Sequence, residues 1–207
     1  MPLQNWDDPQ VWANAYKLKK ASNPNEWADG YVRDCSMYTA APGKANQIIN
    51  ALGIQSTDTV GVIGGGYGWI GNQIAIQTGC VVAVVDTSAV IQSGKAQNAD
   101  VEIINADVTN NNGRNQVKQA LGITGNNKAS YMITEEIITC LDDTEATQLS
   151  TFLNNISNQV VHYTTEIDPD KLASGNQDPN YNWKTLEDWK LLLPNDLIMS
   201  SADYRVV

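Results

Sequence analysis

The sequence predicts an α/β fold of three layers, a Rossmann-like arrangement in which helices cover both faces of a mostly parallel sheet. Three observations predict it. Strand-like and helix-like segments alternate from Thr59 onward, the apolar strands lack in–out alternation, and a glycine cluster joins the first strand to the next helix. The 207 residues suit one domain with a full core. We therefore expect a single domain over residues 1–207, with a helical cap over 1–55 and a core over 56–207.

The predicted cap differs in composition from the rest of the chain. It holds three of the six tryptophans, Trp6, Trp12 and Trp27. The stretch "DDPQVWANAYKLKK" begins with acids and a proline, as helix N-termini often do. A second helix is predicted from Lys44 to Leu52, ended by Gly53. We expect these helices to lead into the core and not to fold as a separate domain.

In the predicted core, each strand is followed by a helix until a short tail closes the chain. The predicted strands are 59–64, 80–86, 101–107, 129–136, 159–167, 196–200 and 204–207. The predicted helices are 69–78, 88–97, 113–121, 142–156 and 182–193. Gly79 and Pro194 mark helix ends, and Asp142, Asp143 and Thr144 are candidate helix caps. The last two strands form an extended tail, for which antiparallel pairing stays open.

Charge and cysteine content exclude several classes of function. The net charge is −10 and the pI about 4.4, so phosphate backbones and anionic membranes are repelled. No segment approaches the ~20 apolar residues that cross a bilayer. Cys35, Cys80 and Cys140 show no zinc-ligand spacing, and we expect no metal site. An odd cysteine number without a signal peptide predicts a cytoplasmic protein.

The glycine turn is the strongest candidate for a ligand site. Gly64, Gly65, Gly66 and Gly68 follow the first strand directly, and glycine lets a backbone turn sharply and approach a ligand. The next helix points its free N–H groups toward whatever binds there. Asp86 ends the neighbouring strand, so its carboxylate should lie beside the turn, where it can accept both ribose hydroxyls. A tight turn for packing alone is the alternative.

A small NAD(P)-binding oxidoreductase is one function that this turn allows. The run Gly66-x-Gly68-x-x-Gly71 matches the dinucleotide pattern GxGxxG. If the count begins at Gly64, however, the third position is Trp69, which disfavours close packing of helix on strand. The ~120 residues after Asp86 also leave little room for a second substrate domain.

Four motifs in order resemble those of the class I S-adenosylmethionine-dependent methyltransferases: "VIGGGYG", "VVDTS", "INADV" and "YMITEEIITCLDD". The resemblance implies methyl transfer to a small molecule or a protein side chain by direct displacement, with S-adenosylmethionine as cofactor. The cofactor-binding residues that it implies are Gly64, Gly65, Gly66, Tyr67, Gly68, Asp86, Thr87, Asp107, Val108 and Glu135. Val62 and Cys140 depart from the family's pattern, which commonly has an acid and a histidine at these positions.

The resemblance also implies a role for each strand-end residue. Asp86 binds the ribose, Asp107 the adenine amino group, and Glu135 lies near the methionine part. Val108 lies against the adenine ring. Three acids suit a ligand without phosphate and would repel a diphosphate. Direct displacement mainly needs alignment of the reacting atoms and exclusion of water.

No catalytic group is clear from the sequence, and Glu136 and His162 are weak candidates. His162 is the sole histidine and could be a general base; a buried histidine bonded to backbone is the alternative. Glu136 could contact substrate, cap a helix or face solvent. A non-catalytic protein that binds an adenosyl ligand therefore stays open. We expect a small molecule or a protein as substrate and not a nucleic acid, since "TEEI" stands where many amino-methylating nucleic-acid enzymes carry "DPPY". The sequence does not give the oligomeric state.

Aromatic residues of the cap could contribute to the same site. Tyr31, Tyr38 and Tyr67 could line a pocket over the cationic sulfonium, because aromatic faces attract cations. Arg33 could meet the cofactor carboxylate. Ordinary core packing of the aromatic residues, and a surface position for Arg33, are the alternatives.

Overall fold

The computed structural model describes residues 36–66, 68–86, 101–164 and 181–200. They form a six-stranded sheet in the order β3-β2-β1-β4-β5-β6, and every neighbouring pair is parallel. The strands are β1 (Thr59–Ile63), β2 (Val81–Asp86), β3 (Glu102–Asn105), β4 (Ala129–Glu135), β5 (Ser157–Thr164) and β6 (Leu197–Ser200). The predicted fold class is confirmed.

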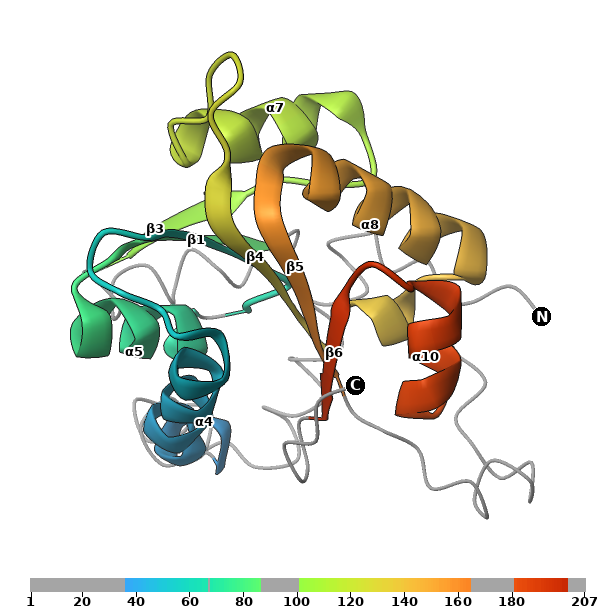
Figure 1. Cartoon of the computed structure of the whole chain (residues 1–207), viewed down its shortest axis with the longest axis horizontal. Coiled ribbons are helices and arrows are strands. Elements are labelled where there is room, and N and C mark those ends of the chain that lie inside the picture. Colours follow the sequence, from blue (N-terminus) through green and yellow to red (C-terminus); the bar gives the residue numbers. More distant parts are fainter. Residues whose placement is uncertain (1–35, 67, 87–100, 165–180, 201–207) are drawn as a thin grey trace, which may run out of the picture.

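Helices cover the two faces of the sheet (Figure 1). One face carries α4 (Ser36–Leu52) and α5 (Trp69–Thr78). The other carries α7 (Asn111–Ala120), α8 (Asp143–Ile156) and α10 (Leu186–Leu192). A short 3-10 helix, η1 (Ile138–Cys140), follows β4. The described chain therefore has three layers, with the sheet in the middle.

Both faces of the strands are buried, which explains their unbroken apolar sequence. In β1, Val62 belongs to the cluster under α4 and α5, while its neighbour Ile63 belongs to the cluster under α7, α8 and α10. The exposed fractions are 0% for Val62 and 1% for Ile63. A strand with two covered faces needs apolar residues at successive positions.

The ends of α5 and α8 agree with the sequence signals. Gly79 ends α5 with a φ of 72°, a conformation that glycine adopts without steric cost. The Asp142 side chain accepts a hydrogen bond from the Glu145 N–H, and Glu145 bonds back to the Asp142 N–H. This reciprocal capping satisfies two N–H groups that would otherwise lack partners.

Two helix starts differ from the predictions by more than two residues. Helix α4 begins at Ser36 and runs through Pro42, so the predicted start at Lys44 is wrong; Pro42 and Gly43 did not break the helix. Helix α10 begins only at Leu186, because the Thr185 side chain accepts from the Asp188 N–H and caps it there.

Antiparallel pairing, left open for the two strands of the tail, is wrong for the first of them. Strand β6 runs parallel to β5, with Val161 opposite Leu197 and Thr164 opposite Ser200. The predicted segments 88–97 and 204–207 and the first cap helix lie outside the described residues. No helix in the described ranges has the length and hydropathy to span a membrane.

The described part of the predicted cap packs directly on the sheet. Ala41, Ala45 and Ile48 of α4 are at most 1% exposed and belong to the same cluster as the β1 and β2 valines. Helix α4 lies beside α5 in Figure 1. It is therefore an integral part of the core, and it carries Lys44.

Candidate functional site

The topology places a candidate site at the carboxyl ends of β1 and β4. The chain builds β1, β2 and β3 toward one edge, and then β4, β5 and β6 toward the other. The order therefore reverses between the neighbours β1 and β4. Ligands of open α/β sheets bind at such a reversal, beyond the carboxyl ends of the strands. The loops that begin at Gly64 and at Glu136 meet there.

Gly64 brings the two loops into contact. Its φ is +76°, and a Cβ added to it would lie 2.8 Å from the Glu135 carbonyl oxygen and 3.1 Å from Ile137 Cβ. No other residue would fit without moving the second loop. Gly66 also has a positive φ, +52°, but no atom of the described residues lies within 4 Å of its Cβ position. The turn is thus closed against β4 at Gly64 and open at Gly66.

Asp86 holds the glycine turn at the end of β2. Its Oδ2 atom accepts a hydrogen bond of 2.8 Å from the Gly66 N–H. The Gly64 N–H donates to the Val85 carbonyl, also at 2.8 Å. The structure thus places Asp86 beside the turn, as the sequence predicts, with its side chain half-buried.

Helix α5 starts immediately after the turn and approaches the sheet closely. Gly68 is its N-cap residue, with a φ of 77° and no side-chain cap. A Cβ on Gly71 would lie 2.5 Å from Val84 Cγ2, so glycine at this position permits the close approach of helix to strand. The expectation that Trp69 would prevent that approach is wrong, because Gly71 makes the contact.

Glu135 lies under the glycine turn with an unsatisfied carboxyl group. Its Oε2 atom is 3.8 Å from the Cβ position of Gly65. This oxygen is buried and has no hydrogen-bond partner in the described part of the chain. Burial raises the pKa of Glu135 to about 8; the charges of Glu136 and Asp86 add to the rise, and that of Lys44 opposes it. At neutral pH the group is therefore mostly uncharged.

Glu136 forms the turn after β4 in a strained conformation. Its φ of 56° is the only positive φ outside glycine among the described residues. The Glu136 N–H donates to the Tyr163 carbonyl at 2.8 Å, and its own carbonyl accepts from Thr139 Oγ1 at 2.9 Å. A non-glycine residue in this region costs about 1–3 kcal/mol, and such strain is concentrated at functional sites.

Asp107 and Val108 have local contacts that the motif did not suggest. Asp107 Oδ1 accepts from the Thr109 N–H at 2.8 Å and from Thr109 Oγ1 at 2.6 Å. Asp107 Oδ2 accepts from Asn110 Nδ2 at 2.6 Å. Val108 is 4% exposed and packs in the cluster that includes Val117 of α7. These contacts stabilise the turn that leads into α7.

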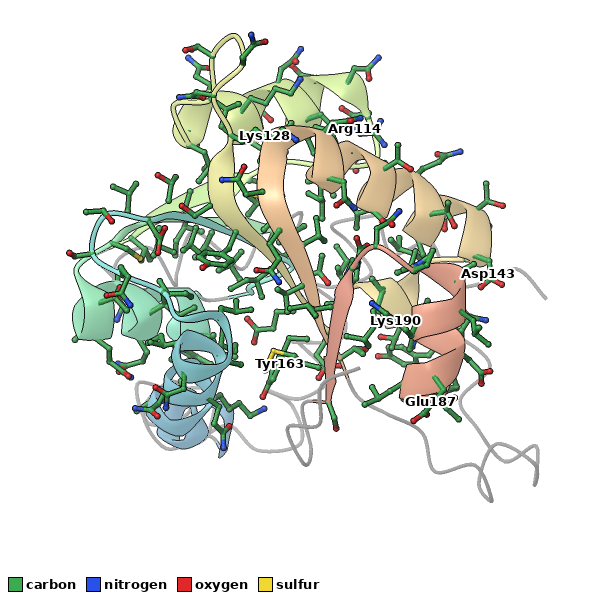
Figure 2. All side chains as sticks on the ribbon, in the orientation of Figure 1. Arg114, Lys128, Asp143, Tyr163, Glu187 and Lys190 are labelled. Atoms are coloured by element: carbon green, nitrogen blue, oxygen red, sulfur yellow. The ribbon has the colours of Figure 1, made fainter. Side chains whose placement is uncertain are left out.

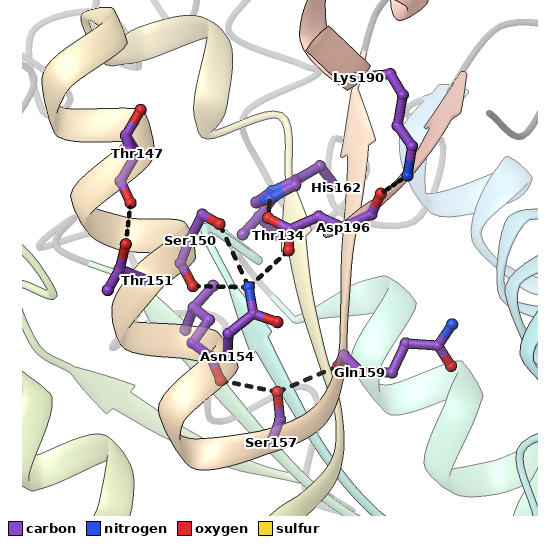
Figure 3. A network of polar contacts seen from close by, with 11 residues as sticks. Thr134, Thr147, Ser150, Thr151, Asn154, Ser157, Gln159, His162, Lys190 and Asp196 are labelled. Carbon is purple, nitrogen blue, oxygen red and sulfur yellow. Dashed lines mark hydrogen bonds and ion pairs between the residues drawn. The ribbon is translucent and has the colours of Figure 1, made fainter. Parts of the chain in front are cut away.

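His162 lies inside the protein, on the face opposite Glu135. It is 0% exposed; its Nδ1 is 2.7 Å from Thr134 Oγ1 and its Nε2 is 2.8 Å from Asp196 Oδ2 (Figure 3). Its partners are side chains, not the backbone groups that the alternative reading expected. A fully buried side chain does not touch a substrate as placed, so we infer a structural role for it.

For several other predicted site residues, the structure describes no side chain. Tyr31, Arg33, Tyr67 and Thr87 fall outside the described ranges, and the side chain of Tyr38 is not among those described. Burial raises the pKa of Cys140 to about 12, so it stays a thiol. No three described His, Cys, Asp or Glu residues gather as metal ligands.

Lys44 also belongs to this site, and the sequence alone did not predict this. Its Nζ lies 5.6 Å from the centre of the Tyr163 ring, and Tyr163 is the β5 neighbour of Glu135 in the sheet register. Figure 2 labels Tyr163 near the carboxyl end of β5. No local pattern around Lys44 signals this contact, because it depends on how α4 packs on the sheet.

Comparisons with known proteins show similarity in structure only. No protein-family model and no curated protein sequence matches the chain. A magnesium protoporphyrin IX methyltransferase from Synechocystis PCC 6803, with bound SAH, is 12% identical with a TM-score of 0.58, over 91% of this chain and 95% of that one.

Two further solved structures are longer proteins. A putative O-methyltransferase from Nostoc punctiforme PCC 73102 is 14% identical with a TM-score of 0.59, over 82% of this chain and 54% of that one. A mitomycin 7-O-methyltransferase is 15% identical with a TM-score of 0.59, over 94% of this chain and 58% of that one. The chain spans a little over half of their length. The described chain has the fold of the class I methyltransferases.

Proposed function

We propose that this protein binds S-adenosylmethionine and transfers its methyl group, by direct displacement, to a small molecule or a protein side chain. The observation that carries the proposal is the hydrogen bond between the Gly66 N–H and Asp86, at the point where the strand order reverses. The Glu135 carboxyl group lies next to the same glycine turn. The similarity to solved structures of methyltransferases, one with bound SAH, supports the proposal.

The residues present fit an adenosyl ligand with a charged amino-acid end. Asp86 offers a carboxylate for ribose hydroxyls, and the open side of Gly66 leaves space for a ligand against the backbone. The Glu135 Oε2 atom lacks a partner that a ligand ammonium group would supply. Burial, and to a lesser extent the charges of Glu136 and Asp86, raise the pKa of Glu135, and the same acidic surroundings are unfavourable to a diphosphate.

Each group acts by position and charge. The bound cofactor supplies an electrophilic methyl group on a sulfonium. The glycine turn lets the backbone approach the ligand, and the first turn of α5 directs its free N–H groups toward it. Asp86 fixes the ribose, and Glu135 lies near the methionine part. Alignment and exclusion of water then lower the barrier to displacement.

The adenine side and the acceptor side are proposed from the motif. Asp107 and Val108 would face the adenine, and Tyr67 and Thr87 would complete the cofactor contacts. Glu136, at the strained turn, is the candidate that faces the acceptor. An acidic protein of net charge −10 disfavours nucleic acid as acceptor. We propose a cytoplasmic location, because three widely spaced cysteines are typical of a protein from a reducing compartment.

Titration calorimetry with S-adenosylmethionine, S-adenosylhomocysteine and NADH tests the proposed cofactor. We expect the two adenosyl ligands to bind and NADH not to bind. Asp86→Ala should weaken adenosyl binding by about 1–3 kcal/mol, since the ribose loses its acceptor. Asp188→Ala, on the exposed side of α10, is the control and should bind normally. NADH as the sole ligand, or full affinity in Asp86→Ala, would contradict the proposal.

One observation keeps a second function in view. The protein's single histidine is fully buried, so it cannot serve as a general base where it stands. A protein that binds the adenosyl ligand without catalysis would share every other feature of the site. Transfer of a labelled methyl group to any member of a broad acceptor panel supports the enzyme, and ligand binding without transfer supports the binding protein.

A further inference from the structure

A buried carboxyl group and a lysine lie near each other at the carboxyl ends of β4 and β5 without forming an ion pair. Glu135 ends β4, and its register neighbour on β5 is Tyr163. Lys44 reaches the same place from α4, with its Nζ 5.6 Å from the Tyr163 ring centre. Lys44 also lowers the pKa of Glu135 through its charge, so the two groups interact electrostatically.

The side chains involved share one face of the sheet. Tyr163 and Ile133 belong to the cluster under α4 and α5, and side chains two positions apart in a strand point the same way. Glu135, two residues after Ile133, therefore points toward α4 as well. Its Oε2 atom near Gly65 agrees with this placement.

Neither side chain forms an ion pair with another described residue. No ion pair joins Lys44 to Glu135 within the described chain. The Glu135 Oε2 atom is buried without a hydrogen-bond partner in the same residues. A buried polar atom left unpaired is costly, and this cost would be removed by a ligand that supplies a donor.

From this placement we propose that Lys44 and Glu135 form the subsite for a zwitterionic α-amino-acid end of the ligand. Lys44 takes the ligand carboxylate, and Glu135 takes the ligand ammonium group. The inference rests on the proposed function, because it assigns this subsite to the amino-acid end of the adenosyl cofactor. It makes α4 a determinant of ligand specificity through one side chain.

Binding should also move a proton. Burial raises the pKa of Glu135 to about 8, so the free protein holds this group mostly protonated at pH 7. The charged or titratable groups around it are Lys44 on α4, Tyr163 on β5, Glu136 in its own turn and Asp86 on β2. An arriving ammonium group favours the carboxylate, so the ligand's binding should release up to about one proton.

A series of three thioether ligands isolates each contact by calorimetry. S-adenosylhomocysteine carries both charges, its decarboxylated analogue carries only the ammonium group, and methylthioadenosine carries neither. The wild-type protein should bind them with affinity falling about tenfold or more at each step. Lys44→Met should weaken only S-adenosylhomocysteine, about tenfold. Glu135→Gln should weaken the first two ligands and spare methylthioadenosine.

Two controls keep the result specific. Lys118→Met removes another lysine that lies over an aromatic ring, at 5.9 Å from the Phe152 ring centre on the opposite face, and should leave all three affinities unchanged. Heats measured in buffers of different ionisation enthalpy give the protons released, which Glu135→Gln should abolish. The ligand series on the wild-type protein tests the subsite even where a variant fails to fold.

The outcomes separate this subsite from the proposed cofactor. Equal wild-type affinity for S-adenosylhomocysteine and methylthioadenosine would overturn the subsite while the adenosyl ligand stands. So would a Lys44→Met variant that weakens all three ligands equally. A wild-type protein that binds none of the three overturns the proposed function and the subsite together.

Discussion

Asp86 and Asp107 stand at two strand ends but are held in different ways. Asp86 accepts from the Gly66 N–H, 20 residues away along the chain. Among the described residues, the Asp107 side chain accepts from groups two and three residues ahead of it, on Thr109 and Asn110. Asp86 therefore joins two elements of the site, whereas Asp107 stabilises the turn before α7.

The local bonds of Asp107 predict an effect on folding. Asp107→Ala removes three acceptor contacts from the turn before α7, whose N-cap residue is Asn110. We expect the free energy of unfolding to fall by about 1 kcal/mol, as for the loss of a helix cap. Urea denaturation measures it, and Asp107→Asn, which keeps one oxygen acceptor, should lose less.

One result would contradict this predicted loss of stability. Full stability in Asp107→Ala, whatever its affinity for adenosyl ligands, would show that these contacts do not stabilise the turn before α7. The sequence contained the relevant signal, since Asp followed by Thr and Asn is typical of local side-chain turns.

At the scale of elements, the close approach of α5 to β2 depends on one small residue. A Cβ on Gly71 would lie 2.5 Å from Val84 Cγ2 and 3.4 Å from Val82 Cγ1. Both valines belong to the core under α4 and α5. The helix that starts at the glycine turn is thus positioned by its packing as well as by the turn.

Gly71→Ala and Gly43→Ala form a matched pair of helix substitutions. Gly71→Ala should destabilise the protein by about 1–3 kcal/mol, because the added methyl group overlaps β2. Gly43 is an exposed position of α4 with no atom within 4 Å of its Cβ position. Gly43→Ala should stabilise by about 0.5–1 kcal/mol through helix propensity. Thermal unfolding compares them, and equal shifts would contradict the packing of α5.

The sequence predicted elements better than it predicted contacts between them. Residues 69–78 form α5 with the predicted bounds, since Gly68 and Gly79 flank an apolar run. The start of α4 was wrong because Pro42 and Gly43 signal a break that packing on α5 overrides. The contact of Lys44 with Tyr163 could not be predicted, because it joins residues from two layers that only the fold brings together.

At the scale of the molecule, one buried polar network ties the edge of the sheet to two helices (Figure 3). Asp196, 0% exposed, binds His162 of β5 and accepts from Asn154 Nδ2 of α8 at 2.6 Å. Its carbonyl accepts from Lys190 Nζ of α10, also at 2.6 Å. Thr134 extends the network to β4, one residue before Glu135.

The network predicts a pH-dependent contribution to stability. Burial alone would raise the pKa of Asp196, but hydrogen bonds from His162, Ser150 and Asn154 outweigh it and lower the pKa below 3.8. The stabilisation is therefore fully present above pH 3.8 and is lost as the pH falls through the folded-state value. Asp196→Asn should cost about 1.5–3 kcal/mol at pH 7, as for the loss of hydrogen bonds to a charged group.

Urea denaturation of the wild-type protein and Asp196→Asn between pH 7 and pH 2.5 measures this contribution. The difference in unfolding free energy should shrink below pH 3.8. Asp188→Asn, at an exposed position of α10, is the control and should follow the wild-type curve more closely. A difference that stays constant with pH would mean that the charge of Asp196 does not matter.

A crystal structure of the protein grown with S-adenosylhomocysteine tests the central claim most directly. We expect the nucleoside to lie beyond the carboxyl ends of β1 and β2. Its ribose hydroxyls should donate to Asp86, and its amino-acid end should lie between Lys44 and Glu135. A ligand bound elsewhere, or a ribose that makes no contact with Asp86, would contradict it.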